Sequence, residues 1–271
     1  MFTFKLNDQH ELPAIGSGTN TFGKENRDYI GEINYDTTPI ESAIKVGYRR
    51  FDSAISYRNE AVLSLGIKQS EIPRNELFIT SKLPGREGYI ESREQVIAAI
   101  QSSLTALDTD YIDLYLIHRP WDDMKQVLMV WKIFEEYQQK GIFKSIGVSN
   151  FNEEQLQYLI DHSDTVPAVN QIESNPSNFN DELIDYCQSQ GIVAEAWGPF
   201  HKMSDHQIEV LTEIGKPYHK SWAQVLLRYQ LDRGVAVIPK SHSSKRQASN
   251  LDVFDFTLSD DDRQKIKKLS N

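Results

Sequence analysis

Eight short apolar runs recur along this chain, and segments with helical spacing separate most of them. The runs lie near residues 13–18, 49–53, 77–82, 112–118, 143–148, 167–172, 192–197 and 235–239. Between two of them, in residues 92–107, apolar side chains fall at three- and four-residue intervals and form one helical face. Eight strands alternating with helices in about 250 residues predict an α/β fold, a (β/α)8 TIM barrel. A doubly wound open sheet is the competing architecture.

The ends of the predicted elements carry further signals. Residues 2–12 precede the first run and predict a short N-terminal β-hairpin with Asn7 and Asp8 at its turn. Thr38-Pro39 offers a helix cap followed by a proline in the first turn, and Asn152 to Gln155 has the spacing of a capping box. No shift in composition and no Gly/Ser-rich linker divides the chain, so residues 1–271 are expected to form one domain.

Charge, hydropathy and cysteine content exclude several classes of function. The formal net charge of −10 disfavours nonspecific binding of nucleic acid, which needs positive potential. No run of about 20 apolar residues predicts a membrane-spanning helix. Cys187 is the one cysteine, so an internal disulfide and a cysteine-based zinc site are excluded, and no metal is expected. With no signal-peptide pattern at the start, a cytoplasmic setting is expected.

Polar side chains gather where the predicted strands end. If the strands are parallel in one barrel, their carboxyl ends form one rim, which is where such barrels carry their chemistry. Asp52, Lys82 and His118 end three successive runs, and Tyr57 follows Asp52 by five residues. A phenol, an ammonium, a carboxylate and an imidazole at one rim suit the donation of a proton. Ser149, Asn150, Gln171, Glu173, Trp197 and Lys240 are expected at the same rim.

Five sequence blocks, in order along the chain, resemble the motifs of the aldo-keto reductases. They are Pro13–Thr19, Phe51–Ala54 with Tyr57–Glu60, Tyr111–His118, Ser145–Phe151, and Val237–Ser241 with Arg246 and Asn250. Lys82 stands between the second and third blocks, and the resemblance covers nearly the whole chain. The family fold is a (β/α)8 barrel, which agrees with the count of apolar runs.

The resemblance implies a role for each residue of the rim. Tyr57 matches the family's general acid, Lys82 and Asp52 match the pair that tunes it, and His118 matches the residue that orients the substrate carbonyl. A nearby ammonium would lower the pKa of Tyr57 from its ordinary value of about 10. His118 is expected to be a neutral hydrogen-bond donor to the carbonyl oxygen.

The resemblance also implies NADPH as the cofactor. Ser149, Asn150 and Gln171 match the residues that bind the nicotinamide carboxamide, and Trp197 matches the aromatic residue that stacks on its ring. Gly198, Pro199 and Phe200 begin the loop over the pyrophosphate, and Gly18, Thr19 and Asn20 are expected to line the same site. Lys240, Ser241 and Arg246 match the cradle of the 2′-phosphate, and Asn250 matches an adenine contact. Two departures, Gln247 and Ser249, fall at the adenine end.

The substrate pocket is where this chain departs most from the family. Asn20, Phe22 and Arg119 are expected to line it. Arg119 stands where the family usually has a tryptophan, and Pro120 restricts it to extended conformations. Two orientations stay open: Arg119 points across the pocket mouth, where it would recruit carbonyl compounds bearing a carboxylate or phosphate, or it turns outward and pairs with Asp122 or Asp123.

Together these features predict an NADPH-dependent enzyme that reduces a small aldehyde or ketone, and the resemblance implies a monomer. The expected subtype is an alcohol dehydrogenase (NADP+) or carbonyl reductase. Two alternatives stay open. One is a nicotinamide-sensing subunit that keeps the fold with little turnover. The other is a barrel glycosidase that uses Glu173 and Glu195 as its paired carboxylates.

Overall fold

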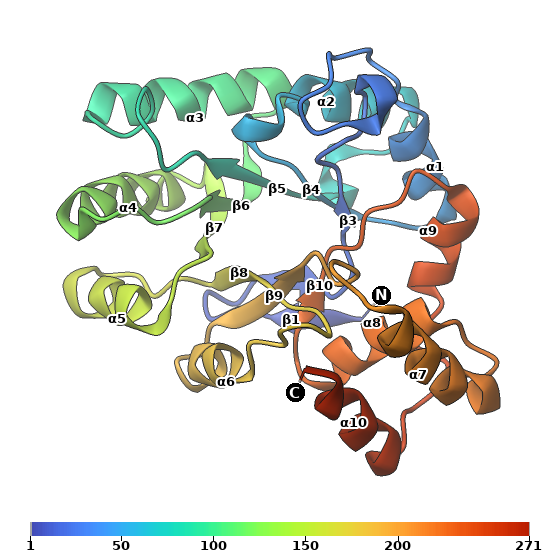
Figure 1. Ribbon diagram of the computed structural model, residues 1–271. Coiled ribbons are helices and arrows are strands. Elements are labelled where there is room, and N and C mark those ends of the chain that lie inside the picture. Colours follow the sequence, from blue (N-terminus) through green and yellow to red (C-terminus); the bar gives the residue numbers. More distant parts are fainter. Residues whose placement is uncertain (1, 271) are drawn as a thin grey trace.

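The computed structural model describes residues 2–270, and it has eight parallel strands curled into a barrel with helices outside (Figure 1). The strands lie in the order β10-β9-β8-β7-β6-β5-β4-β3, and an isolated parallel bridge between Ile15 and Val237 joins the two ends of the sheet. The strands are β3 (Ser17–Gly18), β4 (Arg50–Asp52), β5 (Phe78–Leu83), β6 (Ile112–Ile117), β7 (Phe143–Ser149), β8 (Val169–Glu173), β9 (Val193–Trp197) and β10 (Ala236–Val237). The prediction of a (β/α)8 barrel is confirmed, since a doubly wound sheet would leave its end strands unjoined.

Each of the eight apolar runs overlaps one of these strands, and three strands extend one residue beyond their run; helices fill the connections between the strands. The helices are α1 (Thr38–Val46), α2 (Glu60–Gln69), α3 (Arg93–Leu107), α4 (Met124–Gln139), α5 (Glu153–His162), α6 (Asp181–Ser189), α7 (Asp205–Gly215), α8 (Trp222–Asp232), α9 (Ser244–Leu251) and α10 (Asp260–Lys267). The predicted capping box at Asn152 is confirmed. The predicted cap at Thr38 is wrong by one residue. Thr37 precedes α1, and its hydroxyl makes no cap; it lies within hydrogen-bond distance of Glu41 Oε1 and Gln69 Oε1, at 2.5 and 2.6 Å.

The predicted N-terminal hairpin is confirmed and closes the floor of the barrel. Strands β1 (Thr3–Lys5) and β2 (Glu11–Pro13) pair antiparallel. Leu6 and Leu12 are fully buried and belong to one apolar cluster with Leu114 of β6. Because the hairpin occupies the end where the strands begin, the loops that follow the strands are left to form the opposite, functional end.

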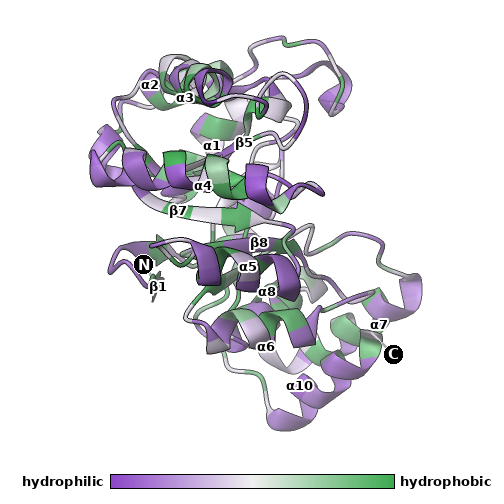
Figure 2. Cartoon of the chain, turned by 90° about the vertical axis from the view of Figure 1, so that its left-hand side faces the viewer, coloured by the Kyte–Doolittle hydropathy of each residue, from purple (hydrophilic) through white to green (hydrophobic). Residues whose placement is uncertain are grey.

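The main core lies between the strands and the surrounding helices. On α4, Val127, Trp131 and Phe134 are fully buried, and Phe134 stacks edge-on against Phe143 of β7 with ring centroids 5.6 Å apart. In Figure 2, α4, α5 and α6 carry both hydrophobic and hydrophilic residues, as expected of helices with one face on a core. Burial of each large apolar side chain contributes about 1.5–3 kcal/mol to the free energy of unfolding. This packing fixes the strands and therefore the positions of the residues at their carboxyl ends.

Among residues 2–270, none of the helices combines the length and the apolar character that crossing a membrane would require.

Candidate active site

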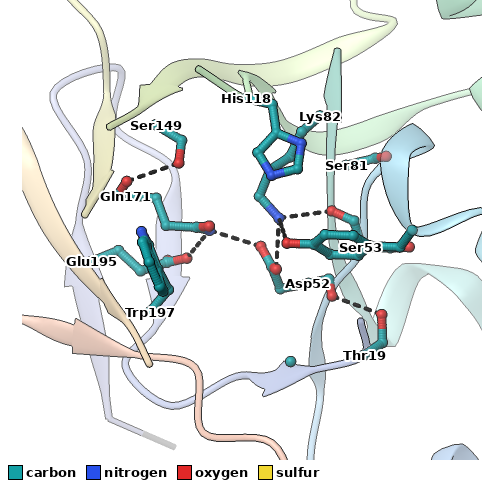
Figure 3. A network of polar contacts seen from close by, with 12 residues as sticks. Thr19, Asp52, Ser53, Ser81, Lys82, His118, Ser149, Gln171, Glu195 and Trp197 are labelled. Carbon is teal, nitrogen blue, oxygen red and sulfur yellow. Dashed lines mark hydrogen bonds and ion pairs between the residues drawn. The ribbon is translucent and has the colours of Figure 1, made fainter. Parts of the chain in front are cut away.

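The four residues predicted to act on the proton come together at the rim. Asp52 ends β4, Lys82 lies near the end of β5, His118 follows β6, and Tyr57 closes a single 3-10 turn, Ile55–Tyr57, just beyond β4. The Nζ atom of Lys82 donates to Asp52 Oδ1 at 2.6 Å and to Tyr57 Oη at 3.3 Å (Figure 3). A third bond, to the Ser53 carbonyl at 2.8 Å, fixes the ammonium between the carboxylate and the phenol.

The pKa shift of His118 agrees with the prediction of a neutral imidazole, and the pKa shift of Tyr57 contradicts the predicted direction. Burial, together with the charges of Lys82, Arg119 and Arg86, lowers the pKa of His118 to about 3, so the imidazole is neutral at physiological pH. Burial and the Asp52 carboxylate raise the pKa of Tyr57 well above its ordinary value, whereas a lowered value was predicted. Burial also lowers the pKa of Lys82, which weakens the influence of its ammonium on the phenol, although Asp52 acts in the opposite direction. The phenol therefore stays protonated and available as an acid.

A second group of side chains holds the neighbouring wall of the site. Asn150 adopts a left-handed backbone conformation (φ 63°) directly after β7. Its Nδ2 donates to the His118 carbonyl at 3.0 Å and to Ser149 Oγ at 2.9 Å, and its Oδ1 accepts from Trp197 Nε1 at 2.9 Å. Ser149 Oγ in turn donates to the Gln171 carbonyl at 2.8 Å. The ends of β6, β7, β8 and β9 are thus tied together by polar side chains predicted to bind the cofactor.

Gln171 links this wall to the catalytic carboxylate and to the floor of the barrel. Its Nε2 donates to Asp52 Oδ2 at 2.8 Å and to Glu195 Oε1 at 2.6 Å (Figure 3). Glu195 forms an ion pair with Arg50, and both side chains are fully buried inside the barrel. Arg50 also donates to the Pro13 carbonyl at 2.8 Å. A buried polar network therefore runs from Lys82 down to the N-terminal strands. The sequence analysis did not name Arg50, and it named Glu195 only as a candidate glycosidase carboxylate.

The paired carboxylates of a glycosidase are not found. Glu195 is inaccessible and neutralised by Arg50, and Glu173 lies near His201 and Lys202, at 3.8 and 3.6 Å. Neither carboxylate lines the cavity beside Tyr57. The glycosidase alternative is wrong because its two groups lie in different environments.

A cavity of about 610 Å³ opens above Tyr57 and His118. As predicted, Gly18, Thr19, Asn20, Ser149, Asn150, Gln171, Trp197, Gly198, Pro199, Phe200 and Lys240 line it. Sequence reasoning missed Tyr29, Ser56, Arg86, His201 and Ile238, which also line it. Tyr29 reaches the site from the long loop after β3, and its ring lies edge-on to that of Tyr57 with centroids 5.9 Å apart. The sequence feature that could have identified Arg86 is its position four residues after Lys82, in the loop that follows a predicted strand.

A second cavity of about 560 Å³ adjoins the first, and the two share Phe200 and Lys240. Ser241, Arg246 and Asn250 line it as predicted, together with Arg27, Trp222, His242 and Lys245. Burial and the charges of Arg246 and Arg27 lower the pKa of Lys240, and burial and the charges of Lys240 and Arg27 lower the pKa of His242 to about 4. Cations that repel one another in this way form a site that favours an anion.

The two cavities fit a phosphorylated dinucleotide. The Oδ1 atom of Asn20 is buried at the cavity and has no hydrogen-bond partner, so it can accept from a bound ligand. A Cβ atom on Gly18 would lie 3.2 Å from the Ile238 carbonyl, so glycine is suited to this crowded wall. Gly198, at φ 59°, turns the chain after Trp197. An aromatic wall and an amide acceptor at one end and a cationic cradle at the other match the parts of NADPH.

Two expectations about the substrate pocket are decided by the fold. Phe22 is fully buried, packs edge-on against His242 with centroids 4.9 Å apart, and does not line the cavity, so its predicted role is wrong. The turn from Thr19 to Phe22 directs the ring into the core. Arg119 is exposed and lines the cavity. It forms no ion pair with Asp122 or Asp123 within the described part of the chain, so the outward orientation is wrong.

Comparisons with known proteins agree with this site. The model of the aldo/keto reductase family matches residues 14–271. The chain is 42% identical to the glyoxal reductase of Bacillus subtilis over 269 residues, which cover 99% of this chain and 92% of that protein. The crystal structure of an aldo/keto reductase from Brucella melitensis superposes with a TM-score of 0.90 at 36% identity and covers 99% of both chains. A Bombyx mori aldo-keto reductase in complex with NADP gives a TM-score of 0.88 at 36% identity, covering 99% of this chain and 92% of the other.

The family model matches nearly the whole chain, and the match to the Bacillus subtilis protein covers most of both sequences at 42% identity. The chain belongs to the aldo/keto reductase family.

Proposed function

We propose that this oxidoreductase reduces small aldehydes and ketones with hydride from NADPH, and that Tyr57 donates the proton. The observation that carries the proposal is the position of Lys82, which contacts both Asp52 and Tyr57 beside a neutral His118. The cavity above these residues shares two lining residues, Phe200 and Lys240, with a cationic cavity suited to a phosphate. The relatives named glyoxal reductase, and the relative solved with NADP, support the same reaction class.

The cofactor would be held by both cavities. Asn150, Gln171 and Trp197 would surround the nicotinamide, and Lys240 and Arg246 would bind the 2′-phosphate. When bound, NADPH supplies the hydride that reduces the carbonyl carbon. The hydrogen bonds among Asn150, Ser149 and Trp197 restrict the rotamers of this wall before any ligand arrives, which lowers the entropy lost on binding.

The protein's own groups complete the reaction with a proton. His118 directs a hydrogen bond to the carbonyl oxygen and polarises the bond without carrying charge. As negative charge develops on that oxygen, Tyr57 Oη transfers its proton to it, and the product is an alcohol. An alkoxide is a much stronger base than a phenolate, so the transfer is favourable even from a phenol of raised pKa. Lys82 stabilises the phenolate that is left, and Asp52 favours the charged form of Lys82.

The subtype, an alcohol dehydrogenase (NADP+) or carbonyl reductase acting as a monomer, is part of the proposal. A cavity of this size, in which aromatic side chains and a few polar groups line the space beside Tyr57, suits a range of small carbonyl compounds. The alternative of a nicotinamide-sensing subunit would not need a proton donor, so the contact between Lys82 and Tyr57 favours an active enzyme.

A single experiment tests the proposal. NADPH oxidation is followed by absorbance with glyoxal and other carbonyl compounds, for the wild type and for Tyr57→Phe. Turnover should fall by at least about 100-fold, while NADPH binding, measured by quenching of tryptophan fluorescence, should change little. Tyr35→Phe, at an exposed tyrosine outside the cavity, is the matched control. Near-normal turnover in folded Tyr57→Phe would exclude Tyr57 as the donor, and NADPH binding without wild-type turnover on any carbonyl would favour the sensing subunit.

A further inference from the structure

Two arginine side chains at the mouth of the cavity have no part in the reaction proposed above. Arg86 follows β5 and Arg119 follows β6, and both are exposed and line the cavity. The other charged side chains of the lining, apart from its two histidines, have assigned tasks. Asp52 holds Lys82, and Lys240 faces the phosphate cradle. The two guanidinium groups are therefore cations facing the space where the substrate carbonyl must lie.

Neither guanidinium is neutralised by the protein. Among residues 2–270, no ion pair or side-chain hydrogen bond involves Arg86 or Arg119. Two of the nearby carboxylates have other partners: Glu91 accepts from the backbone of Gly88 at 2.9 Å, and Asp123 accepts from the first turn of α4 at 3.0 and 3.2 Å. Arg86 lies over the ring of Tyr89, 5.5 Å from its centroid, a contact that orients the side chain and leaves its charge free.

The charges of both arginines reach the reacting groups. They contribute to the lowered pKa of His118, and Arg119 also acts to lower the pKa of Tyr57, against the larger effect of burial. In a chain with a formal net charge of −10, the two arginines extend the positive charge of the adjoining cationic cavity to the active-site mouth. Such a field concentrates anions at the cavity and repels cationic compounds.

The backbone holds the two arginines in a fixed relation. A Cβ atom at Gly85 would lie 2.2 Å from the Arg119 carbonyl oxygen and 2.8 Å from the Trp121 ring, so the two loops are packed directly against each other. Pro84 and Pro120 flank this contact and restrict the backbone on both sides. The two arginines thus extend from loops that are packed against each other. This packing reduces the conformational entropy that is lost when both side chains bind one ligand.

We propose that Arg86 and Arg119 together bind an anionic group of the substrate, so that the enzyme prefers aldehydes and ketones bearing a carboxylate or a phosphate. The inference rests on the proposed reductase function and names the substrate class of the same site. A guanidinium presents two parallel N–H donors that match the oxygens of either anion. His118 and Tyr57 hold the carbonyl, and the arginines hold the other end of the molecule.

The test uses matched pairs of substrates that differ in charge. One pair is 4-formylbenzoate and its methyl ester, and the other is glyceraldehyde 3-phosphate and glyceraldehyde. The variants are Arg86→Met, Arg119→Met and the double variant, which remove charge and keep most of the side-chain length. Arg93→Met is the control, because Arg93 is an exposed arginine on α3, paired with Glu136 outside the cavity. Thermal unfolding checks that every variant is folded.

Each single variant should lower kcat/KM for the charged member by about 10-fold or more, mainly through KM, since a hydrogen bond to a charged group contributes about 1.5–3 kcal/mol. The neutral member should change less than about threefold, and added salt should weaken only the charged member. The pair with the larger loss identifies carboxylate or phosphate as the group bound.

Equal losses for charged and neutral members, or a wild type without preference between them, would overturn the inference. If the wild type still reduces the neutral members and depends on Tyr57, the reductase function stands and only the charge preference fails. If the wild type reduces none of the four compounds, the inference and the reductase function fail together on these substrates.

Discussion

Replacing Glu195 by Gln is expected to destabilise the fold strongly, because Arg50 would be left as a buried charge without a partner. Both side chains are fully buried, and the guanidinium also donates a hydrogen bond to the Pro13 carbonyl at 2.8 Å. Glutamine keeps the size of glutamate and an oxygen that can accept from Gln171 Nε2, which donates to Glu195 at 2.6 Å in the wild type. The substitution therefore removes the charge and changes little else.

Breaking a buried ion pair by removing one partner costs about 3–5 kcal/mol. The total free energy of unfolding of a domain is about 5–15 kcal/mol, so roughly a fifth of it or more would be lost. With a urea dependence of about 3 kcal/mol per molar, the unfolding midpoint should fall by about 1–2 M. Urea unfolding followed by tryptophan fluorescence and by circular dichroism measures this shift.

The double variant Arg50→Met/Glu195→Gln separates the charge from the packing. Methionine removes the unpaired cation and fills much of the same space, so at least half of the lost stability should return. A double variant as unstable as Glu195→Gln alone would refute the reasoning. In that case the contact to Pro13, or the packing of the arginine stem, would be what stabilises the floor of the barrel.

Three further predictions concern the cofactor, pH and loop support. Arg246→Ala should weaken NADPH binding by about 10- to 150-fold and leave NADH binding unchanged, as measured by fluorescence titration; equal losses would contradict the phosphate cradle. His118 has a pKa of about 3 when folded and about 6.5 when unfolded, so its contribution to stability is complete above pH 6.5 and is lost as pH falls. Between pH 7 and pH 5 the wild type should lose about 2 kcal/mol more than His118→Asn in urea unfolding, and equal losses would argue against the lowered pKa. Asn59 is buried and donates to the carbonyls of Thr19 and Phe22 at 2.7 and 3.1 Å. Asn59→Ala should therefore lower the free energy of unfolding by about 2–4 kcal/mol in urea unfolding. A loss below about 1 kcal/mol would show that other contacts hold this loop.

Residues whose position follows from regular structure were predictable from the sequence. Asp52, Lys82 and His118 could be placed because each lies at the end of an apolar run, and parallel strands in a barrel present their ends at one rim. The side chains of the neighbouring wall, such as Asn150 and Trp197, were predicted in the same way with help from the family resemblance.

Residues whose role depends on long-range contacts were not predictable. Arg50 and Glu195 lie 145 positions apart, and only the closed barrel brings them together. Tyr29 comes from a loop without periodic pattern, and the direction of the Phe22 ring is set by a turn that the sequence does not specify. The pKa of Tyr57 was predicted in the wrong direction because desolvation depends on the final packing of the cavity, and that packing cannot be read from the types of the neighbouring residues.

The closure of the barrel joins the first and last strands of the sheet through very little pairing. Strands β3 and β10 have two residues each. Three backbone hydrogen bonds form the seam: Gly16 N to the Val237 carbonyl and Val237 N to the Ala14 carbonyl, both 2.9 Å, and Gly18 N to the Pro239 carbonyl, 3.2 Å. Gly18 on one side of this seam and Lys240 on the other both line the cavity. A nucleotide bound there would contact both sides of the seam. Its contribution to the free energy of unfolding of the closed barrel would rise with the logarithm of the nucleotide concentration. We therefore expect slower amide hydrogen exchange at Gly16 and Val237, and slower proteolysis, at high NADPH concentration. The lifetime of the enzyme would then increase with the concentration of NADPH.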